Sequence, residues 1–488
     1  MDLISLLAIV CLLHSALFFM DLLFKTCSHH PYTYFLQNTG LSVQPLRITW
    51  FSTACNRFLQ KCGSWRPRLL HCWFTVGSWC SLGLAPAAVY LVVKATFDIW
   101  HRNVDPGGRH SSVVLEPMIP GVNLPMSDFS YYSLTLITCS AVHELGHAIA
   151  AVREDVHVAG LGVALVLVFP VAYVQLSGEQ LRALPPRRQL RVTCAGVWHN
   201  VVLALVAALA LLLLPLLLYP LYDTGSGVYV RHVQQGSPVE GSTGLREGDR
   251  VVAVNQCEVG DTEDWYYCML GAVRDPSPGY CVSSELARKH DESVPVKQLA
   301  GGGIECCGPG SEHHLCFEYL ERDEGAPQLP QHSCLPVRTV VENAPRLCVL
   351  GADCPPDLHC LRPLLDNVTR LVRLERGTSP PVLYLGSPAS AYRSVRVGDY
   401  VPLHRALPPG VPEAVARLCK YLVVFSAGLA AVNLVPCFWL DGRHIAWAAC
   451  ELLLGQSSER QAVAAAITTL GTCFLSLCFL SMAAVELL

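Results

Sequence analysis

Charged residues are scarce in this chain of 488 residues, and it contains no long run of lysine and arginine. Only 15% of the residues are charged and the formal net charge is -4 at pH 7, so a nucleic acid is not expected as a partner. The hydrophobic fraction of 52% is too high for an ordinary soluble protein. The composition therefore favours a membrane protein of several domains.

Apolar runs of membrane length occur in six places and predict a polytopic α-helical membrane protein with about six transmembrane helices. The first run has no basic segment before it and no small-residue cleavage site after it. We therefore interpret it as a retained helix and not as a cleaved signal peptide. The expected spans are approximately 3–24, 71–97, 129–152, 192–222, 412–436 and 462–487.

The segments between the early spans differ in composition. Residues 25–70 are polar and contain basic residues but no Asp or Glu, so the positive-inside rule predicts a cytosolic loop. Residues 98–128 are rich in Gly and Pro and are expected to be a linker. Residues 158–176 are rich in Val, Leu and Gly and are interrupted by Pro170, which favours a re-entrant β-hairpin over a further span.

Two histidines lie four residues apart in the third apolar run, in the sequence His143-Glu144-Leu145-Gly146-His147. On a helix this spacing places both imidazole rings on one face, where they can bind one metal ion. Glu144 lies beside the first histidine, where a carboxylate can act as a general base. Ionisable groups are costly at bilayer depth unless they are paired, metal-bound or hydrated. The apolar flanks therefore favour a metal site over the alternative, two surface histidines on a soluble helix.

A third metal ligand is expected near the other end of the chain. Pro436 would break a helix there, and such breaks are tolerated where the freed backbone lines a site. Catalytic zinc sites have three protein ligands and one open position, so we predict Asp441 as the third ligand. A helix-end cap is the alternative role for Asp441. Asn200 and Asn433 are candidate oxyanion or substrate-positioning groups, and for Asn200 a plain hydrogen bond between helices is an equal alternative.

Ten of the 23 cysteines fall between Cys257 and Cys360, in a polar stretch. Their even number predicts disulfides in an oxidising compartment. A zinc site is the alternative, and the lack of repeated CxxC pairs argues against it. The sequon at Asn367 is a candidate glycosylation site and agrees with a lumenal location.

Short alternating segments between turn residues, from Gly227 to Asn255, predict strands. They resemble a PDZ domain, a module that binds chain ends or extended peptides by adding them as a strand. Residues 383–401 have similar turns and are expected to be a returning part of an interrupted PDZ-like fold. The predicted domains are N-terminal transmembrane helices and loops (1–128), a catalytic membrane core (129–222), a lumenal PDZ-like and Cys-rich domain (223–411) and C-terminal transmembrane helices with the Asp-Gly motif (412–488).

Three motifs follow one another in the chain: His143-Glu-Leu-Gly-His147, Ala195-Gly-Val-Trp-His-Asn200 and Asn433-x-x-Pro436-x-x-x-x-Asp441-Gly442. Together with the inserted Cys-rich region, they resemble the site-2 protease family of intramembrane zinc metalloproteases, and the animal members more than the bacterial ones. The resemblance covers nearly the whole chain. It is weakest in residues 98–115, where this chain lacks a serine-rich run of the animal proteins, and in the last span.

The resemblance implies one zinc ion per chain, held by His143, His147 and Asp441, with Glu144 as the catalytic residue. It also implies an enzyme of the Golgi and endoplasmic reticulum membranes that makes the second cut in regulated intramembrane proteolysis, after site-1 protease has cut in the lumen. The implied substrates are membrane-anchored transcription factors, namely sterol regulatory element-binding proteins and an ER-stress factor. Their released cytosolic fragments enter the nucleus.

Two other classes of function are alternatives. The first is a non-catalytic membrane scaffold that binds zinc and docks partner proteins on its PDZ-like domain. Glu144 argues against it, because a scaffold needs no general base. The second is a zinc transporter, which would need several sites along a path, whereas the sequence offers one set of ligands.

Overall fold

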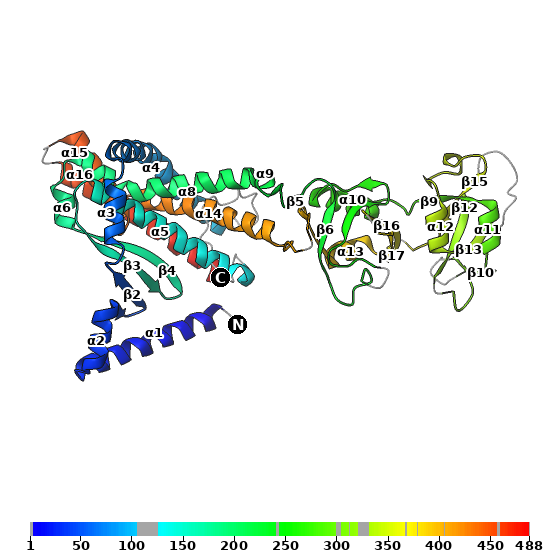
Figure 1. The fold of residues 1–488 in the computed structure, drawn as a ribbon, viewed down its shortest axis with the longest axis horizontal. Coiled ribbons are helices and arrows are strands. Elements are labelled where there is room, and N and C mark those ends of the chain that lie inside the picture. The colour runs from blue at the N-terminus through cyan, green and yellow to red at the C-terminus, as the bar shows by residue number, and fades with distance from the viewer. Residues whose placement is uncertain are drawn as a thin grey trace. The chain divides into compact units, whose positions relative to one another are not determined.

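The computed structural model describes residues 3–104, 125–240, 244–298, 304–311, 313–320, 331–366, 368–377, 379–404, 406–455 and 459–487. The chain divides into two compact units. The first consists of Met1–Leu213 and Val415–Leu488, and the second of Leu214–Ala414. Long helices dominate the first unit and short strands the second (Figure 1). The candidate glycosylation site at Asn367 lies outside the described residues.

Six helices within the described ranges are long and apolar enough to cross a membrane, which confirms the expected number. They are α1 (Leu3–Thr26), α4 (Pro67–Val104), α5 (Phe129–Arg153), α8 (Ala195–Leu212), α14 (Val411–Leu434) and α16 (Arg460–Leu487). α4 is longer than the span expected at 71–97 and takes in the start of the expected linker. The fourth span is shorter than expected, because α8 ends at Leu212 and the short helix α9 (Leu214–Leu218) follows it.

The stretch from residue 158 to 176 forms the predicted hairpin, in which β3 (Val158–Val166) pairs antiparallel with β4 (Phe169–Leu176). The interpretation of residues 25–70 as a loop is wrong for part of that segment. β1 (Leu41–Gln44) and β2 (Arg47–Ser52) pair with each other, and β2 pairs with β3, which gives a four-stranded sheet in the order β1-β2-β3-β4. The basic residues of this segment masked the strand-forming sequence Ile-Thr-Trp-Phe within β2.

Five short helices complete the first unit: α2 (His30–Thr39), α3 (Asn56–Ser64), α6 (Gly178–Ala183), α7 (Pro186–Thr193) and α15 (Asp441–Leu454). The chain breaks at Pro436 as predicted, between the end of α14 and the start of α15. Gly471 of α16 packs against this break, where a Cβ atom would overlap the backbone oxygen of Pro436. The break thus places Asp441 at the first position of α15.

Two segments far apart in the sequence share the first sheet of the second unit, which has the order β17-β16-β7-β6-β18, with β8 paired to β7. Its strands are β6 (Val228–Val233), β7 (Arg250–Val254), β8 (Cys257–Glu258), β16 (Arg370–Arg376), β17 (Val382–Gly386) and β18 (Val395–Gly398). α10 (Thr262–Arg274) packs on this sheet through Trp265 and Met269, which belong to its buried core, and α13 (Pro388–Ser394) lies beside α10. The segment from 383 to 401 therefore does return to the sheet that residues 228–258 begin.

The inserted Cys-rich chain forms a second sheet in the order β13-β12-β15-β9-β14. Its elements are β9 (Gly279–Ser283), α11 (Ser284–His290), β12 (His314–Leu320), β13 (His332–Pro336), α12 (Val337–Asn343), β14 (Leu347–Cys348) and β15 (Leu358–Pro363). Two further strand pairs are β10 (Ser293–Gln298) with β11 (Ile304–Cys307), and β5 (Tyr222–Asp223) with β19 (Val401–Pro402).

All ten cysteines of this stretch form disulfides, which confirms the prediction. The pairs are Cys257–Cys268, Cys281–Cys354, Cys306–Cys316, Cys307–Cys334 and Cys348–Cys360. Three of them, Cys281, Cys348 and Cys354, lie close enough together to suggest a metal site, but each sulfur is already bonded to another sulfur. No thiolate remains among them for zinc.

Candidate metal centre

The paired histidines lie on one face of α5, as their spacing predicts. The imidazole rings of His143 and His147 are both buried, with centroids 4.8 Å apart. α5 packs against α8 at this level, and Gly146 allows the close approach. A Cβ atom at Gly146 would lie 2.7 Å from the backbone oxygen of Ala195. The face of α5 that carries the two histidines is therefore covered by α8.

Asp441 meets the two histidines from the other end of the chain. Its Oδ2 atom lies 2.8 Å from Nε2 of His143 and 3.0 Å from Nε2 of His147. One ligand atom from each of the three residues lies within 4.8 Å of the others. Asp441 is the first residue of α15, after the N-cap residue Leu440, and its carboxylate contacts the two histidines; its role as a metal ligand stays a prediction.

Gly196 of α8 keeps open the space beside the histidines. A Cβ atom at this position would lie 2.6 Å from Nε2 of His143 and would also overlap Nε2 of His147. Any residue other than glycine would thus push a side chain onto the two ring nitrogens. Two imidazoles and a carboxylate are a donor set that suits zinc, and the residues present fit such an ion.

The ring nitrogens of His143 and His147 that face away from this space also have hydrogen-bond partners. His147 Nδ1 lies 2.8 Å from the backbone oxygen of Val192, which accepts its proton and leaves Nε2 free to bind a cation. His143 Nδ1 lies 3.1 Å from the amide nitrogen of Asn200, which is fully buried on α8. For Asn200 the structure therefore shows the alternative contact, a hydrogen bond between helices, and its oxyanion role stays a prediction.

Glu144 points toward the edge strand β4. The backbone N–H of Val174 donates to Glu144 Oε2 at 2.9 Å, and the backbone N–H of Ala172 donates to Ser140 Oγ at 3.1 Å. The candidate general base is thus fixed at the free edge of the sheet, one residue along α5 from a candidate ligand.

Asn433 makes a local contact. Its amide nitrogen donates to the backbone oxygen of Leu429 at 3.0 Å within α14, and the side chain is largely buried. In the described part of the chain, no hydrogen bond connects Asn433 with His143, His147 or Asp441. Its role in positioning substrate stays a prediction.

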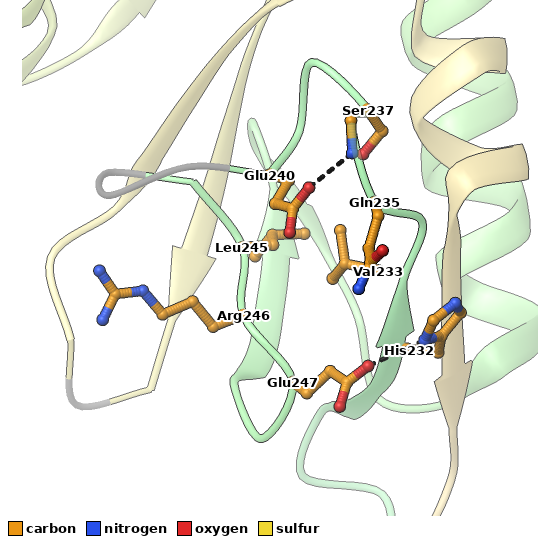
Figure 2. Close-up of a pocket in the computed structure, with 9 residues that line it drawn as sticks. His232, Val233, Gln235, Ser237, Glu240, Leu245, Arg246 and Glu247 are labelled. Carbon is orange, nitrogen blue, oxygen red and sulfur yellow. Dashed lines mark hydrogen bonds and ion pairs between the residues drawn. The ribbon is translucent and has the colours of Figure 1, made fainter.

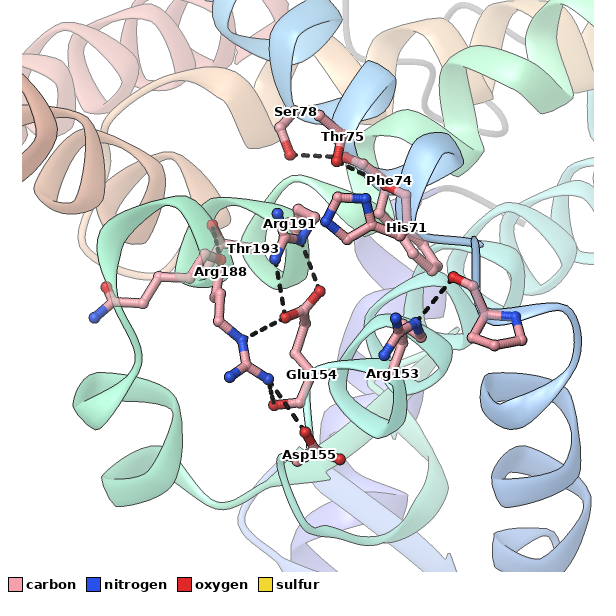
Figure 3. Close-up of polar contacts among 12 residues, drawn as sticks. His71, Phe74, Thr75, Ser78, Arg153, Glu154, Asp155, Arg188, Arg191 and Thr193 are labelled. Atoms are coloured by element: carbon pink, nitrogen blue, oxygen red, sulfur yellow. Dashed lines mark hydrogen bonds and ion pairs between the residues drawn. The ribbon is translucent and has the colours of Figure 1, made fainter. Parts of the chain in front are cut away.

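An ion-pair cluster at the end of α5 was not found from the sequence. Buried Glu154 accepts hydrogen bonds from Arg188 Nε at 2.6 Å and from Arg191 Nε at 2.7 Å, and both arginines lie on α7 (Figure 3). Burial alone would raise the pKa of Glu154, but hydrogen bonds and charge from the two arginines outweigh it and hold the pKa below the usual value. The cluster fixes α7, which supplies the Val192 carbonyl to His147.

The sequence did contain a signal for this cluster. Arg-Glu-Asp directly follows the helix with the histidines, and an Arg-Arg-x-x-Arg segment comes about one hairpin later.

The second unit has a hollow of its own between β6 and β7, near the Gly-Ser-Pro turn (Figure 2). His232 and Glu247 pair across its rim at 2.8 Å, and Glu240 accepts from the backbone N–H of Gly236 at 2.7 Å. Two contacts thus connect polar groups of the lining, and all lining residues belong to the second unit.

The six described helices of membrane length, and the convergence of two histidines and a carboxylate that could hold a metal ion, define a polytopic membrane protein with a candidate metal centre. The sequence profile of peptidase family M50 matches residues 131–478, which is more than half of the chain and includes all three candidate ligands. This chain belongs to peptidase family M50. The family resemblance expected from the motifs is therefore confirmed.

Similarity to one relative agrees with this family assignment. The chain is 32% identical over 207 residues to the membrane-bound transcription factor site-2 protease homolog of Arabidopsis thaliana. The aligned part covers 42% of this chain and 39% of that protein, so the chain spans about two fifths of the relative's length.

Proposed function

We propose that this chain is an intramembrane zinc metalloprotease. The observation that carries the proposal is the convergence of His143, His147 and Asp441, which come from two helices far apart in the sequence, beside the carboxylate of Glu144. Membership of peptidase family M50 supports it.

His143, His147 and Asp441 would hold the zinc ion, which would supply Lewis-acid activation of water and of the scissile carbonyl. Glu144 would accept the proton of the attacking water and deliver it to the leaving amine. The hydrogen bond from Val174 N–H keeps the Glu144 carboxylate beside β4. Because that bond is donated to an oxygen, it stabilises the charged form of the carboxylate, which a general base requires.

β4 is the element best placed to hold the substrate. A transmembrane substrate helix has its peptide groups hydrogen-bonded internally, so it must unwind before attack. An unwound segment can pair with the free edge of a sheet, and β4 is such an edge. Its outward amides at Ala172 and Val174 already donate to Ser140 and Glu144. A substrate strand that pairs with β4 would have to take over these two donors, and it would then lie next to the proposed base.

The proposed substrates are membrane-anchored transcription factors of the sterol regulatory element-binding and ER-stress types, already cut in the lumen. Similarity to a plant protein named for a membrane-bound transcription factor supports membrane-anchored transcription factors as the broader class. Five disulfides support an oxidising compartment for the second unit, as expected for the lumen of the Golgi and endoplasmic reticulum. We propose that this unit is a PDZ-like module that admits only substrates whose lumenal part has been removed.

The test is cleavage of a lumenally pre-cut, membrane-anchored transcription factor in cells that lack their own enzyme. Glu144→Gln removes the base with little change in size, and release of the cytosolic fragment should fall by about 10²–10⁴-fold while the zinc content stays unchanged. Exposed Glu179 on α6 provides the matched control, Glu179→Gln, which should release the fragment normally. A chelator should stop release by the unmodified chain.

Two outcomes would replace this proposal. Equal release by the unmodified chain and Glu144→Gln would favour the zinc-binding scaffold, which works without a general base. Zinc flux across proteoliposomes without any cleavage would favour the transporter.

A further inference from the structure

We propose that Asn200 is a positioning residue that holds His143 in the tautomer able to bind a cation through Nε2. The inference rests on the metal site of the proposed function and assigns a role within it. Asn200 is fully buried, and its amide lies against Nδ1 of His143, on the side of the ring opposite to Asp441.

This role follows from the ring nitrogen on which each of the two histidines must carry its proton. A neutral imidazole carries one proton, so a ring that binds metal through Nε2 must carry the proton on Nδ1 and needs an acceptor there. For His147 the acceptor is the backbone oxygen of Val192, at 2.8 Å. For His143 the group facing Nδ1 is the side-chain amide of Asn200, at 3.1 Å.

Only the oxygen end of that amide can accept the proton. The nitrogen Nδ2 faces Nδ1, while the oxygen Oδ1 is buried and has no hydrogen-bond partner among the described residues. Rotation by 180° about Cβ–Cγ exchanges the two ends without moving any other atom. It places Oδ1 against Nδ1–H of His143 and moves Nδ2 to the position that Oδ1 held, so the choice between the two orientations depends on which nitrogen of His143 carries the proton.

α8 thus acts on His143 at two points, one helical turn apart. Gly196 leaves space at Nε2, and Asn200 meets Nδ1 of the same ring. Residues four apart share one face of a helix, so the Gly-x-x-x-Asn spacing delivers both functions from one surface. The sequence motif from Ala195 to Asn200 gains a physical explanation in these two contacts.

The test is the zinc affinity of the purified full-length protein, measured by competition with a chromophoric chelator. Asn200→Leu keeps the size but cannot accept a hydrogen bond, and it should weaken zinc binding about 10–100-fold. Asn200→Asp keeps an acceptor and should bind at least as tightly as the unmodified chain. Ser78→Ala is the control for loss of a buried polar group. Within the described residues, the hydroxyl of Ser78 on α4 bonds to the backbone oxygen of Phe74 in the same helix and to no other group.

A double-mutant comparison with His143→Ala separates positioning from general damage. If Asn200 acts through His143, Asn200→Leu should cause no further loss of zinc affinity in the His143→Ala background. Additive losses, unchanged affinity of Asn200→Leu, or equal weakness of Asn200→Asp and Asn200→Leu would each overturn the inference. If the unmodified chain binds no zinc, the proposed function itself fails. If it binds zinc and Asn200→Leu binds equally well, only this inference fails.

Discussion

The two units of the molecule use cysteine in opposite ways. All ten cysteines of the second unit are paired in disulfides, whereas the thirteen of the first unit, all within the described residues, are free. The second unit builds two small sheets with separate cores, and small cores benefit from covalent links. The first unit has long helices whose apolar surfaces need no such links.

The difference indicates which interactions determine the structure of each unit. Apolar packing in lipid hardly distinguishes one helix arrangement from another, so close approaches at small residues and buried polar contacts must do so. In the first unit these are glycines such as Gly146 and Gly196, and ion pairs such as those of Glu154. The candidate metal centre lies where α5 and α8 approach each other at these two glycines. If this comparison is right, substitutions that add or remove a few atoms should have the largest effects in the first unit. In the second unit, the largest effects should come from loss of disulfides.

The largest effect is expected from one added methyl group at the metal centre. Gly196→Ala would place a Cβ atom against both ring nitrogens of the histidine pair, so zinc binding and cleavage should both be lost. Gly428→Ala is the matched control, because Gly428 also lies in an apolar helix and a Cβ atom there meets nothing within 4 Å. Zinc content by elemental analysis checks both variants. Normal zinc content in Gly196→Ala would show that the site lies elsewhere.

A large effect on stability is expected from the longest disulfide loop of the second unit. Cys281 and Cys354 are 73 residues apart, so replacing both with serine should lower the free energy of unfolding by about 4 kcal/mol. The shorter loop of Cys306 and Cys316, with a separation of 10, should cost about 3 kcal/mol. Denaturant titration of the full chain measures both losses of stability. Unfolding is detected by the appearance of proteolytic cuts within the second unit. A reversed order would show that native contacts dominate over loop length.

The ion pairs of Glu154 are expected to contribute somewhat less to the free energy of unfolding than the disulfide of Cys281 and Cys354. Glu154→Gln leaves two arginines near a buried site without their charge partner, which should cost on the order of 3 kcal/mol. Asp155→Asn is the matched control, because Asp155 pairs with the same Arg188 but is 88% exposed, and exposed pairs contribute at most about 1 kcal/mol. Thermal unfolding of the membrane unit in detergent compares the two variants. Equal losses of stability in the two variants would mean that the burial of Glu154 does not increase what its ion pairs contribute to stability.

The same ion pairs predict a pH dependence. The pKa of Glu154 is below its usual value in the folded protein, so its contribution is complete above the unfolded pKa of about 4.3. It is lost as the pH falls through the lower, folded pKa. The stability difference between the unmodified chain and Glu154→Gln should therefore be constant near neutral pH and should shrink in acid. A difference that grows in acid would contradict the direction of the pKa shift.

The sequence predicted local features and the distant approach of Asp441 to the histidines, but it did not predict several other distant pairings. The face shared by His143 and His147 follows from helical spacing alone, and the break before Asp441 follows from Pro436. Addition of β1 and β2 to the hairpin could not be predicted, because register between distant strands depends on tertiary packing. The disulfide pairs could not be predicted either, since spacing does not determine connectivity. The contacts of Glu154 and Asn200 join residues on different helices and required the structure.

The smallest effect is expected from a single thiol of the first unit. Cys139 is fully buried on α5, with its Sγ atom 3.0 Å from Ser426 Oγ of α14. Cys139→Ala should lower the free energy of unfolding by only about 1 kcal/mol, because a membrane-helix thiol acts as a small apolar residue with a weak hydrogen bond. Exposed Cys80 provides the control, and Cys80→Ala should change stability by less than about 0.5 kcal/mol. The detergent unfolding assay used for Glu154 measures both. A loss at Cys139 as large as that at Cys281 would mean that thiols organise the membrane unit too, and the contrast between the two units would no longer hold.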